Sequence, residues 1–113
     1  MNDNPHARAL AASAKVIRSS FNRRPSLGHL AAVAGLSRFH FRTLFKAHFG
    51  ESPRQMTVRL QTDFAKRLLR RGVPTAEVAT RCGFSDQAHF TRAFKGATGM
   101  SPVGWLRQAR ETH

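Results

Sequence analysis

The clearest pattern of apolar and polar residues lies in residues 83–102, GFSDQAHFTRAFKGATGMSP. Ser85 or Asp86 can cap the start of a helix there through a side-chain oxygen, and Gly99 can end it in a left-handed conformation. Pro102 then starts a further helix. Within the first of these helices, the apolar side chains have the i, i+3, i+4, i+7 spacing of one helical stripe: Phe90, Ala93, Phe94 and Ala97.

A shorter apolar helix is predicted just upstream, over residues 76–82, and Gly83 separates the two helices by a tight turn. A short helix, a tight turn and a longer capped helix are typical of a helix-turn-helix, whose second helix can enter the major groove of DNA.

The same pattern occurs earlier in the chain. After the turn, every matching pair differs by 49 positions (for example 90 − 41). Before the turn the offset is 48, as for Gly35 and Gly83, so one residue is inserted between Gly83 and Phe90. The sequence therefore predicts an internal duplication, with two helix-turn-helix units in one chain. The identities at offset 49 are His40, Phe41, Phe45, Lys46, Gly50, Ser52 and Pro53, which match His89, Phe90, Phe94, Lys95, Gly99, Ser101 and Pro102.

The remaining pattern predicts an all-α fold of seven helices in a single domain. The first helix runs from about His6 to Phe21, the second starts at the cap Ser26, and Ser37 caps the third. A long helix over about 53–71 joins the first helix-turn-helix unit to the second. The units lie at about 27–49 and 75–98, and residues 1–5 and 108–113 are expected to be loose.

The predicted core takes one apolar face from each helix. Its members are Leu10, Ala14, Ile17 and Phe21, then Leu27, Leu30, Ala31 and Ala34, then Phe41, Leu44, Phe45 and His48, then Met56, Leu60, Phe64, Leu68 and Leu69, and finally Trp105, which matches Met56 in the duplication. At ~1.5 Å per residue the long helix is a rigid spacer of ~28 Å. It would let two recognition helices reach successive major grooves, which repeat every ~34 Å.

If Phe41 faces the core, a step of ~100° per residue places a second set of side chains outward on each recognition helix. The residues at the start of such a helix are the ones that touch base edges. Phe39 is large for an outward position, and its partner is either a thymine methyl group or a neighbouring side chain. The candidate DNA-binding residues are Arg38, Phe39, Arg42, Thr43 and Lys46 in the first unit, and Gln87, Ala88, Thr91, Arg92 and Lys95 in the second.

The charge of the chain supports a polyanionic partner. Lys and Arg number 19 against 6 Asp and Glu, which gives a formal net charge of +13. Such a charge attracts nucleic acid and, as the rival, anionic membrane. Two capped and spaced recognition helices favour double-stranded DNA, because nonspecific binding needs charge but not this architecture.

Other chemistry finds little support in the sequence. Cys82 is the only cysteine and is expected to pack as a small apolar residue, and there is no apolar run long enough to cross a membrane. His40 and His89 lie in different units, and no Cys/His cluster has metal-ligand spacing. No catalytic constellation is visible, so neither an enzyme, nor a metal site, nor a cofactor is predicted.

The segments AGLSRFHFRTLFKAHFGESP, FAKRLLRRG and EVATRCGFSDQAHFTRAFKGATGMSP resemble the DNA-binding domain of the AraC/XylS transcription regulators, over roughly Leu27 to Leu106. The sequence departs from the family pattern at Thr43 and at Gln61, where the family often has arginine, although Arg42 lies one place before Thr43. The resemblance implies a bacterial, cytoplasmic, sequence-specific regulator that is commonly an activator and contacts RNA polymerase. It also places an arginine at Arg92, for which guanine recognition, a phosphate contact and plain solvation are the alternatives.

One chain already carries two different recognition helices, so we expect a monomer on an asymmetric site. The main alternative is a generic cationic protein that binds RNA or an anionic membrane. The chain is either a stand-alone regulator or the DNA-binding part of a longer one, and Met1 favours the former.

Overall fold

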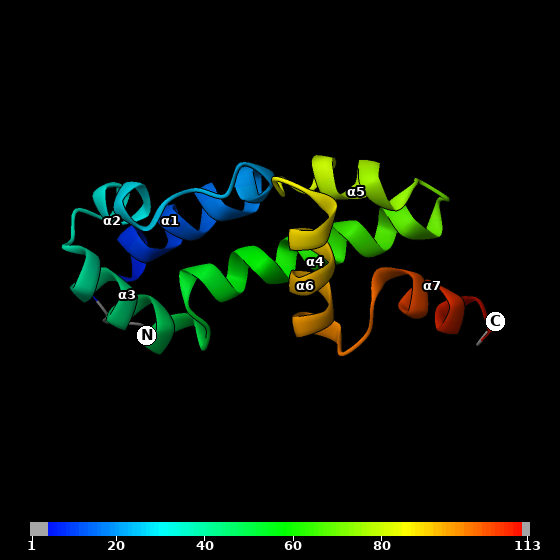
Figure 1. The fold of residues 1–113 in the computed structure, drawn as a ribbon. Helices are drawn as coiled ribbons and strands as arrows, with labels where there is room; N and C mark the ends of the chain where they lie inside the picture. The colour runs from blue at the N-terminus through cyan, green and yellow to red at the C-terminus, as the bar shows by residue number, and fades with distance from the viewer. Residues whose placement is uncertain (1–4, 112–113) are drawn as a thin grey trace. The chain divides into compact units, whose positions relative to one another are not determined.

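Residues 5–111 are described by a computed structural model, and every regular element among them is helical (Figure 1). This confirms the predicted all-α class with seven α-helices. The elements are α1 (Ala7–Ser20), the short 3-10 helix η1 (Phe21–Arg23), α2 (Leu27–Ala34), α3 (Arg38–Phe49), α4 (Pro53–Arg70), α5 (Thr75–Arg81), α6 (Gln87–Thr98) and α7 (Pro102–Glu111).

The chain divides into two compact units, Met1–Thr57 and Val58–His113. The division falls inside α4, so the first turn of this helix belongs to one unit and the remainder to the other. The prediction of one domain over the whole chain stays a prediction.

In the first unit, α1, α2 and α3 enclose a core of fully buried side chains, among them Leu10, Ile17, Phe41 and Phe45. Ser13 is also buried in α1, and its hydroxyl donates a hydrogen bond of 2.8 Å to the carbonyl of Leu30 in α2. The buried hydroxyl therefore ties the first helix of the unit to the second without leaving an unpaired polar group.

Two residues predicted for this core lie elsewhere. Leu27 is 37% exposed, because it is the first residue of α2 and directly follows the cap Ser26. His48 is exposed as well, since Phe49 occupies the end of α3 instead, with its ring centroid 4.6 Å from that of Phe45. The larger apolar ring gains more from burial than the imidazole would.

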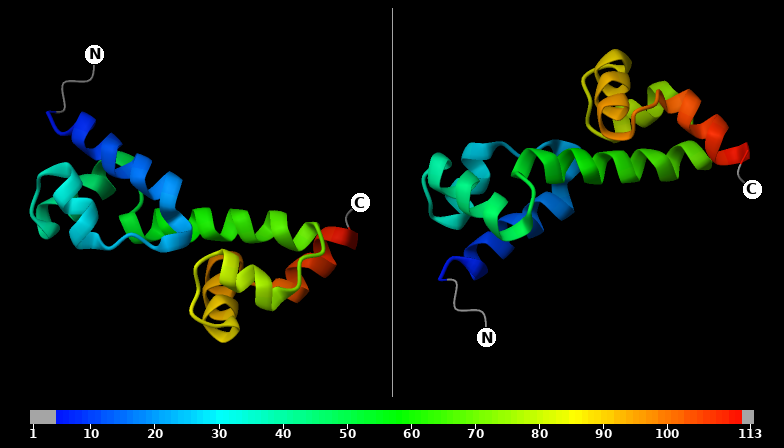
Figure 2. Two further views of the ribbon diagram at one scale, coloured as in Figure 1. Left: turned by 90° about the horizontal axis from the view of Figure 1, so that it is seen from above. Right: turned by 90° about the horizontal axis from the view of Figure 1, so that it is seen from below.

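In the second unit, the C-terminal part of α4 packs with α5 and α6 around Phe90 and Phe94, and Trp105 of α7 covers the edge of this core. Both views of Figure 2 show α7 beside the C-terminal end of α4. Two predictions are wrong here. Ala97, in the last turn of α6, is exposed, and residues 108–111 continue α7 to Glu111 rather than being loose. Residues 1–4 and 112–113, also predicted to be loose, lie outside the described residues.

The duplication is visible in the backbone hydrogen bonds of the two turns. After α2, Gly35 donates to the carbonyl of Ala32 and Leu36 to that of Ala31, and Gly83 and Phe84 repeat both bonds to Thr80 and Ala79 after α5. Each recognition helix is then capped by a side chain that accepts from its third residue. Ser37 caps α3 and Asp86, rather than Ser85, caps α6. The inserted residue is therefore Ser85, between the repeated turn and the cap.

The repeat also extends further upstream than the sequence predicts. At offset 48, Phe21 and Arg24 correspond to Leu69 and Gly72, and the same N–H to C=O bond closes both turns, at 3.1 and 3.0 Å. The backbone is left-handed at both Arg24 and Gly72. Each repeat is thus a unit of three helices, α1–α2–α3 and α4–α5–α6, in which the third helix is the candidate recognition helix.

Candidate nucleic-acid interface

The two sides of α3 differ sharply in exposure. Phe41 and Phe45 are fully buried, whereas Phe39 is 82% exposed. Most of the Phe39 ring is therefore open to solvent, and its contact with a thymine methyl group stays a prediction. The other predicted contact residues of this helix are all exposed as well: Arg38, Arg42, Thr43 and Lys46. Thr43 donates its hydroxyl to the Phe39 carbonyl at 3.0 Å, so only its acceptor sites face solvent.

The same division holds for α6. Phe90 and Phe94 are buried, and four of the five predicted contact residues are exposed: Gln87, Ala88, Arg92 and Lys95. Thr91 is half-buried, so it is less available than the sequence predicted. Asp86 holds the start of the helix, because its carboxylate accepts a 2.7 Å bond from the His89 N–H.

The electrostatics of the two recognition helices suit an anionic ligand. Neither α3 nor α6 contains an aspartate or a glutamate within its bounds. The outward face of α3 carries Arg38, Arg42 and Lys46, and that of α6 carries Arg92 and Lys95. Cationic side chains on exposed helices that are capped and firmly packed can neutralise phosphates without reorganising the scaffold.

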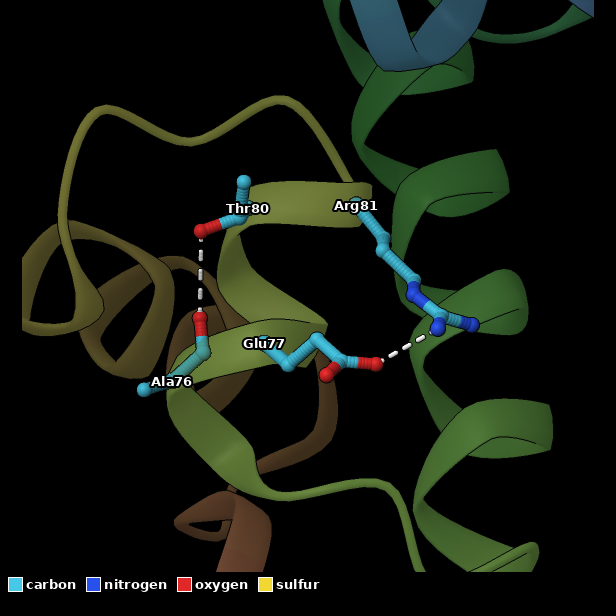
Figure 3. Close-up of polar contacts among 4 residues, drawn as sticks. All are labelled: Ala76, Glu77, Thr80 and Arg81. Atoms are coloured by element: carbon cyan, nitrogen blue, oxygen red, sulfur yellow. Dashed lines mark hydrogen bonds and ion pairs between the residues drawn. The ribbon is translucent and has the colours of Figure 1, made fainter.

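The helix that precedes α6 presents a different kind of surface (Figure 3). Arg81 pairs with Glu77 one turn earlier in α5, and Thr80 donates its hydroxyl to the carbonyl of Ala76 at 3.3 Å. Both members of the ion pair are about half exposed, so the pair contributes only a few tenths of a kcal/mol, about 0.3–0.5. The charge of Arg81 is thereby balanced within α5, in contrast to the unbalanced charges on α6.

Gln61, which differs from the family pattern, lies in the interior of the second unit and not on its surface. Its side chain is 1% exposed, and Nε2 donates a 2.9 Å bond to the carbonyl of Cys82 at the end of α5. The Cys82 thiol donates in turn to the Gln61 carbonyl at 3.5 Å. Sequence periodicity missed this structural role. The signal that could have found it is the offset of 48, which aligns Gln61 with the buried Ser13.

The described residues offer little for other chemistry. Residues 5–111 contain no group of three His, Cys, Asp or Glu side chains that could hold a metal ion. No helix among them is long and apolar enough to cross a membrane. Burial raises the pKa of the Cys82 thiol from 9.0 to about 11, so this cysteine is a packed, unreactive group at neutral pH.

A family model described as "Helix-turn-helix domain", of the AraC type, matches residues 30–108, which cover both turns and both recognition helices. The chain belongs to the AraC-type helix-turn-helix family. Its fold is that of an AraC-type DNA-binding domain.

Curated relatives agree with the family. This chain is 39% identical over 88 residues to the probable transcriptional regulator LumQ of Photobacterium leiognathi. The matched residues cover 77% of this chain and 36% of LumQ. The chain is 32% identical over 96 residues to the MmsAB operon regulatory protein of Pseudomonas aeruginosa, covering 84% of this chain and 31% of that protein. The chain therefore spans about a third of the length of these relatives.

Solved structures of similar fold include the DNA-binding domain of AdpA, a global transcriptional factor, in complex with a target DNA. It has a TM-score of 0.83 and 27% identity, over 93% of this chain and 96% of that one. A probable AraC family transcriptional regulator from Rhodopseudomonas palustris has a TM-score of 0.75 and 26% identity, over 91% and 98% of the two chains.

Proposed function

We propose that the protein regulates transcription by binding double-stranded DNA sequence-specifically, with α3 and α6 each placed in a major groove. The observation that carries the proposal is the division of both helices into a buried phenylalanine side and an exposed side with cations and no acids. Base contacts are assigned to the outward residues near the helix starts, and phosphate contacts to Lys46 and Lys95. The AdpA domain, whose structure was determined with a target DNA, supports DNA as the ligand of this fold.

Arg92 is the residue to which the proposal gives the most specific role, the recognition of a guanine. Its planar guanidinium can donate two hydrogen bonds to guanine O6 and N7 in the major groove. The equivalent residue in α3 is Thr43, which is too short for this contact and already uses its hydroxyl proton within the helix. The two recognition helices would therefore read different bases at the same helical position.

The experiment begins with selection of binding sites from random duplex DNA. Affinity is then measured at one salt concentration for the selected duplex, its single-base variants, a scrambled duplex, a double-stranded RNA and anionic vesicles. Preference for the selected duplex by a factor of roughly 10³ or more is the expected result. Similar affinity for all these ligands would instead favour a generic cationic protein that binds RNA or membranes.

Two matched variants then test the assignment within the site. Arg92→Ala should cost about 1–3 kcal/mol on the selected duplex and relax the requirement at one base pair, while binding to scrambled DNA falls much less. Thr43→Ala, at the equivalent position of α3, should have a far smaller effect. If Arg92→Ala weakens binding to every single-base variant equally, Arg92 contacts the DNA backbone instead.

Activation through RNA polymerase, a cytoplasmic location and a monomeric state are further parts of the proposal. Two different recognition helices in one chain make dimerisation unnecessary for spanning two grooves, and they make a palindromic site unnecessary. Sedimentation of the free and DNA-bound protein should give one chain per asymmetric site of about two helical turns. A stable dimer at micromolar concentration on a palindromic site would contradict this.

A further inference from the structure

The guanidinium group of Arg38 lies against the backbone of Gly28. Arg38 is the first residue of α3, and Gly28 is the second residue of α2, on the other side of the turn. A Cβ atom placed on Gly28 would be 2.8 Å from Nη2 of Arg38, 3.1 Å from Nε and 3.3 Å from Cζ. The 2.8 Å contact is shorter than real Cβ contacts, so a side chain at residue 28 would force the end of the Arg38 side chain to move away from this place.

The second repeat has a different pair at the equivalent positions. Offset 48 aligns Gly28 with Ala76, and offset 49 aligns Arg38 with Gln87. In the second repeat, Gln87 at the start of the recognition helix has no guanidinium group, and Ala76 in the preceding helix has a Cβ atom. The two positions therefore differ together between two repeats that share the backbone hydrogen bonds of their turns.

The glycine does not stabilise the fold in any visible way. Glycine is a poorer helix former than alanine, because it loses more backbone freedom on folding. A cation beside the first turn of α2 is not favoured by the helix dipole, whose positive end lies there, and that turn contains no acidic residue. The arrangement thus requires a reason other than the stability of the free protein.

We propose that Gly28 is a positioning residue, which makes room for the Arg38 guanidinium against α2 and so holds it ready for contact with DNA. The proposal rests on the proposed function, because it concerns the first recognition helix. Arginine loses much side-chain freedom when it is fixed at an interface, and a side chain that is already held in place loses less. With alanine at residue 28, Nη2 would have to withdraw by at least 0.6 Å, from 2.8 to the 3.4 Å of an ordinary contact.

The experiment is a double-mutant cycle of Gly28→Ala and Arg38→Gln, measured as affinity for the selected duplex and as thermal unfolding. The combination of both substitutions copies the pair that the second repeat contains. Gly28→Ala should weaken DNA binding by about three- to tenfold in the presence of Arg38, and by less than twofold in the Arg38→Gln background. Its melting temperature should be unchanged or higher, so the loss of binding would not reflect unfolding.

Ala76→Gly is the matched control, because it makes the reverse change at the equivalent position of α5. It should lower the melting temperature and leave DNA affinity unchanged at a temperature where the variant is folded. The inference would be overturned if Gly28→Ala left the DNA affinity unchanged, or if it lowered the affinity equally with and without the Arg38→Gln substitution. In either case, a preference of the wild-type protein for the selected duplex would still support the proposed function. If the wild-type protein shows no preference for duplex DNA, both fail together.

Discussion

Replacing Gln61 with methionine should destabilise the second unit of the protein. The side chain of Gln61 is buried, and its Nε2 donates to the carbonyl of Cys82 at 2.9 Å. Cys82 lies at the C-cap of α5, where carbonyl groups have no partner within the helix. Methionine has a similar length but no donor, so it would leave this carbonyl buried and unpaired.

The expected cost follows from that unpaired carbonyl. A buried acceptor that loses its partner costs about 1–3 kcal/mol. At roughly 4–8 °C per kcal/mol for a small domain, the melting temperature should fall by about 5–20 °C. The loss is a substantial part of the ~5–15 kcal/mol that stabilises a typical domain.

Thermal and urea unfolding followed by circular dichroism measure this difference directly. Gln108→Met, the same chemical change at an exposed position of α7, is the control and should shift stability by less than about 0.5 kcal/mol. If Gln61→Met and Gln108→Met unfold at the same temperature as the wild-type protein, the bond to Cys82 contributes nothing and the explanation is wrong.

Three further predictions concern the core, the phosphate contacts and the buried thiol. Phe94→Ala should lose about 3–5 kcal/mol of stability in an unfolding experiment, since Phe94 is 1% exposed, whereas truncation of the exposed Phe39 should leave stability nearly unchanged. Lys46→Ala and Lys95→Ala should each weaken binding to all DNA sequences alike and reduce the salt slope by ~1; an altered base preference would contradict the phosphate assignment. The pKa of the Cys82 thiol is about 11 in the folded protein, against an ordinary value of 9.0. As the pH rises from 9 to 11, the unfolded state therefore loses this proton before the folded state does, and the free energy of unfolding falls. Stability measured across this range should fall less steeply for Cys82→Ala than for the wild-type protein.

Sequence reasoning succeeded where a few neighbouring residues decide the structure. Ser26 and Ser37 cap their helices through bonds within one turn, and Gly35 and Gly99 adopt the left-handed conformation that ends a helix. Both effects depend on local geometry, so residue type and position are sufficient to predict them. The stripes of buried phenylalanine were predictable for the same reason, because helical periodicity fixes which side chains share a face.

The predictions failed at helix ends and wherever distant residues meet. Periodicity places His48 on the inner side of α3 but cannot show that Phe49 fills the space there. Offset 48 aligns Ser13 with Gln61, but the two residues share neither size nor functional group, so the alignment alone does not show their common role. It emerges only from their buried hydrogen bonds, which join α1 to α2 and α4 to α5.

The candidate interface was predicted in outline but not in its contacts. The helical period identified the outward residues, and all of them except the half-buried Thr91 are exposed. Periodicity did not reveal that Arg38 lies against Gly28, since that contact depends on how the turn brings α2 and α3 together. Nor can it assign a base to a side chain, which is why the individual contacts remain predictions for the binding experiments.

The comparison of the two repeats separates residues that support the fold from residues that would read DNA. Among the identical pairs, the two phenylalanines are buried, the glycine ends the recognition helix, and the serine accepts a bond from the next helix. Lys46 and Lys95 are different, because they are identical cations and both are exposed. A contact to phosphate requires the same cation whatever the base sequence, whereas a contact to a base edge must change with the base. The remaining outward pairs all differ, as base contacts to two different half-sites would require: Arg38 and Gln87, Phe39 and Ala88, Arg42 and Thr91, Thr43 and Arg92.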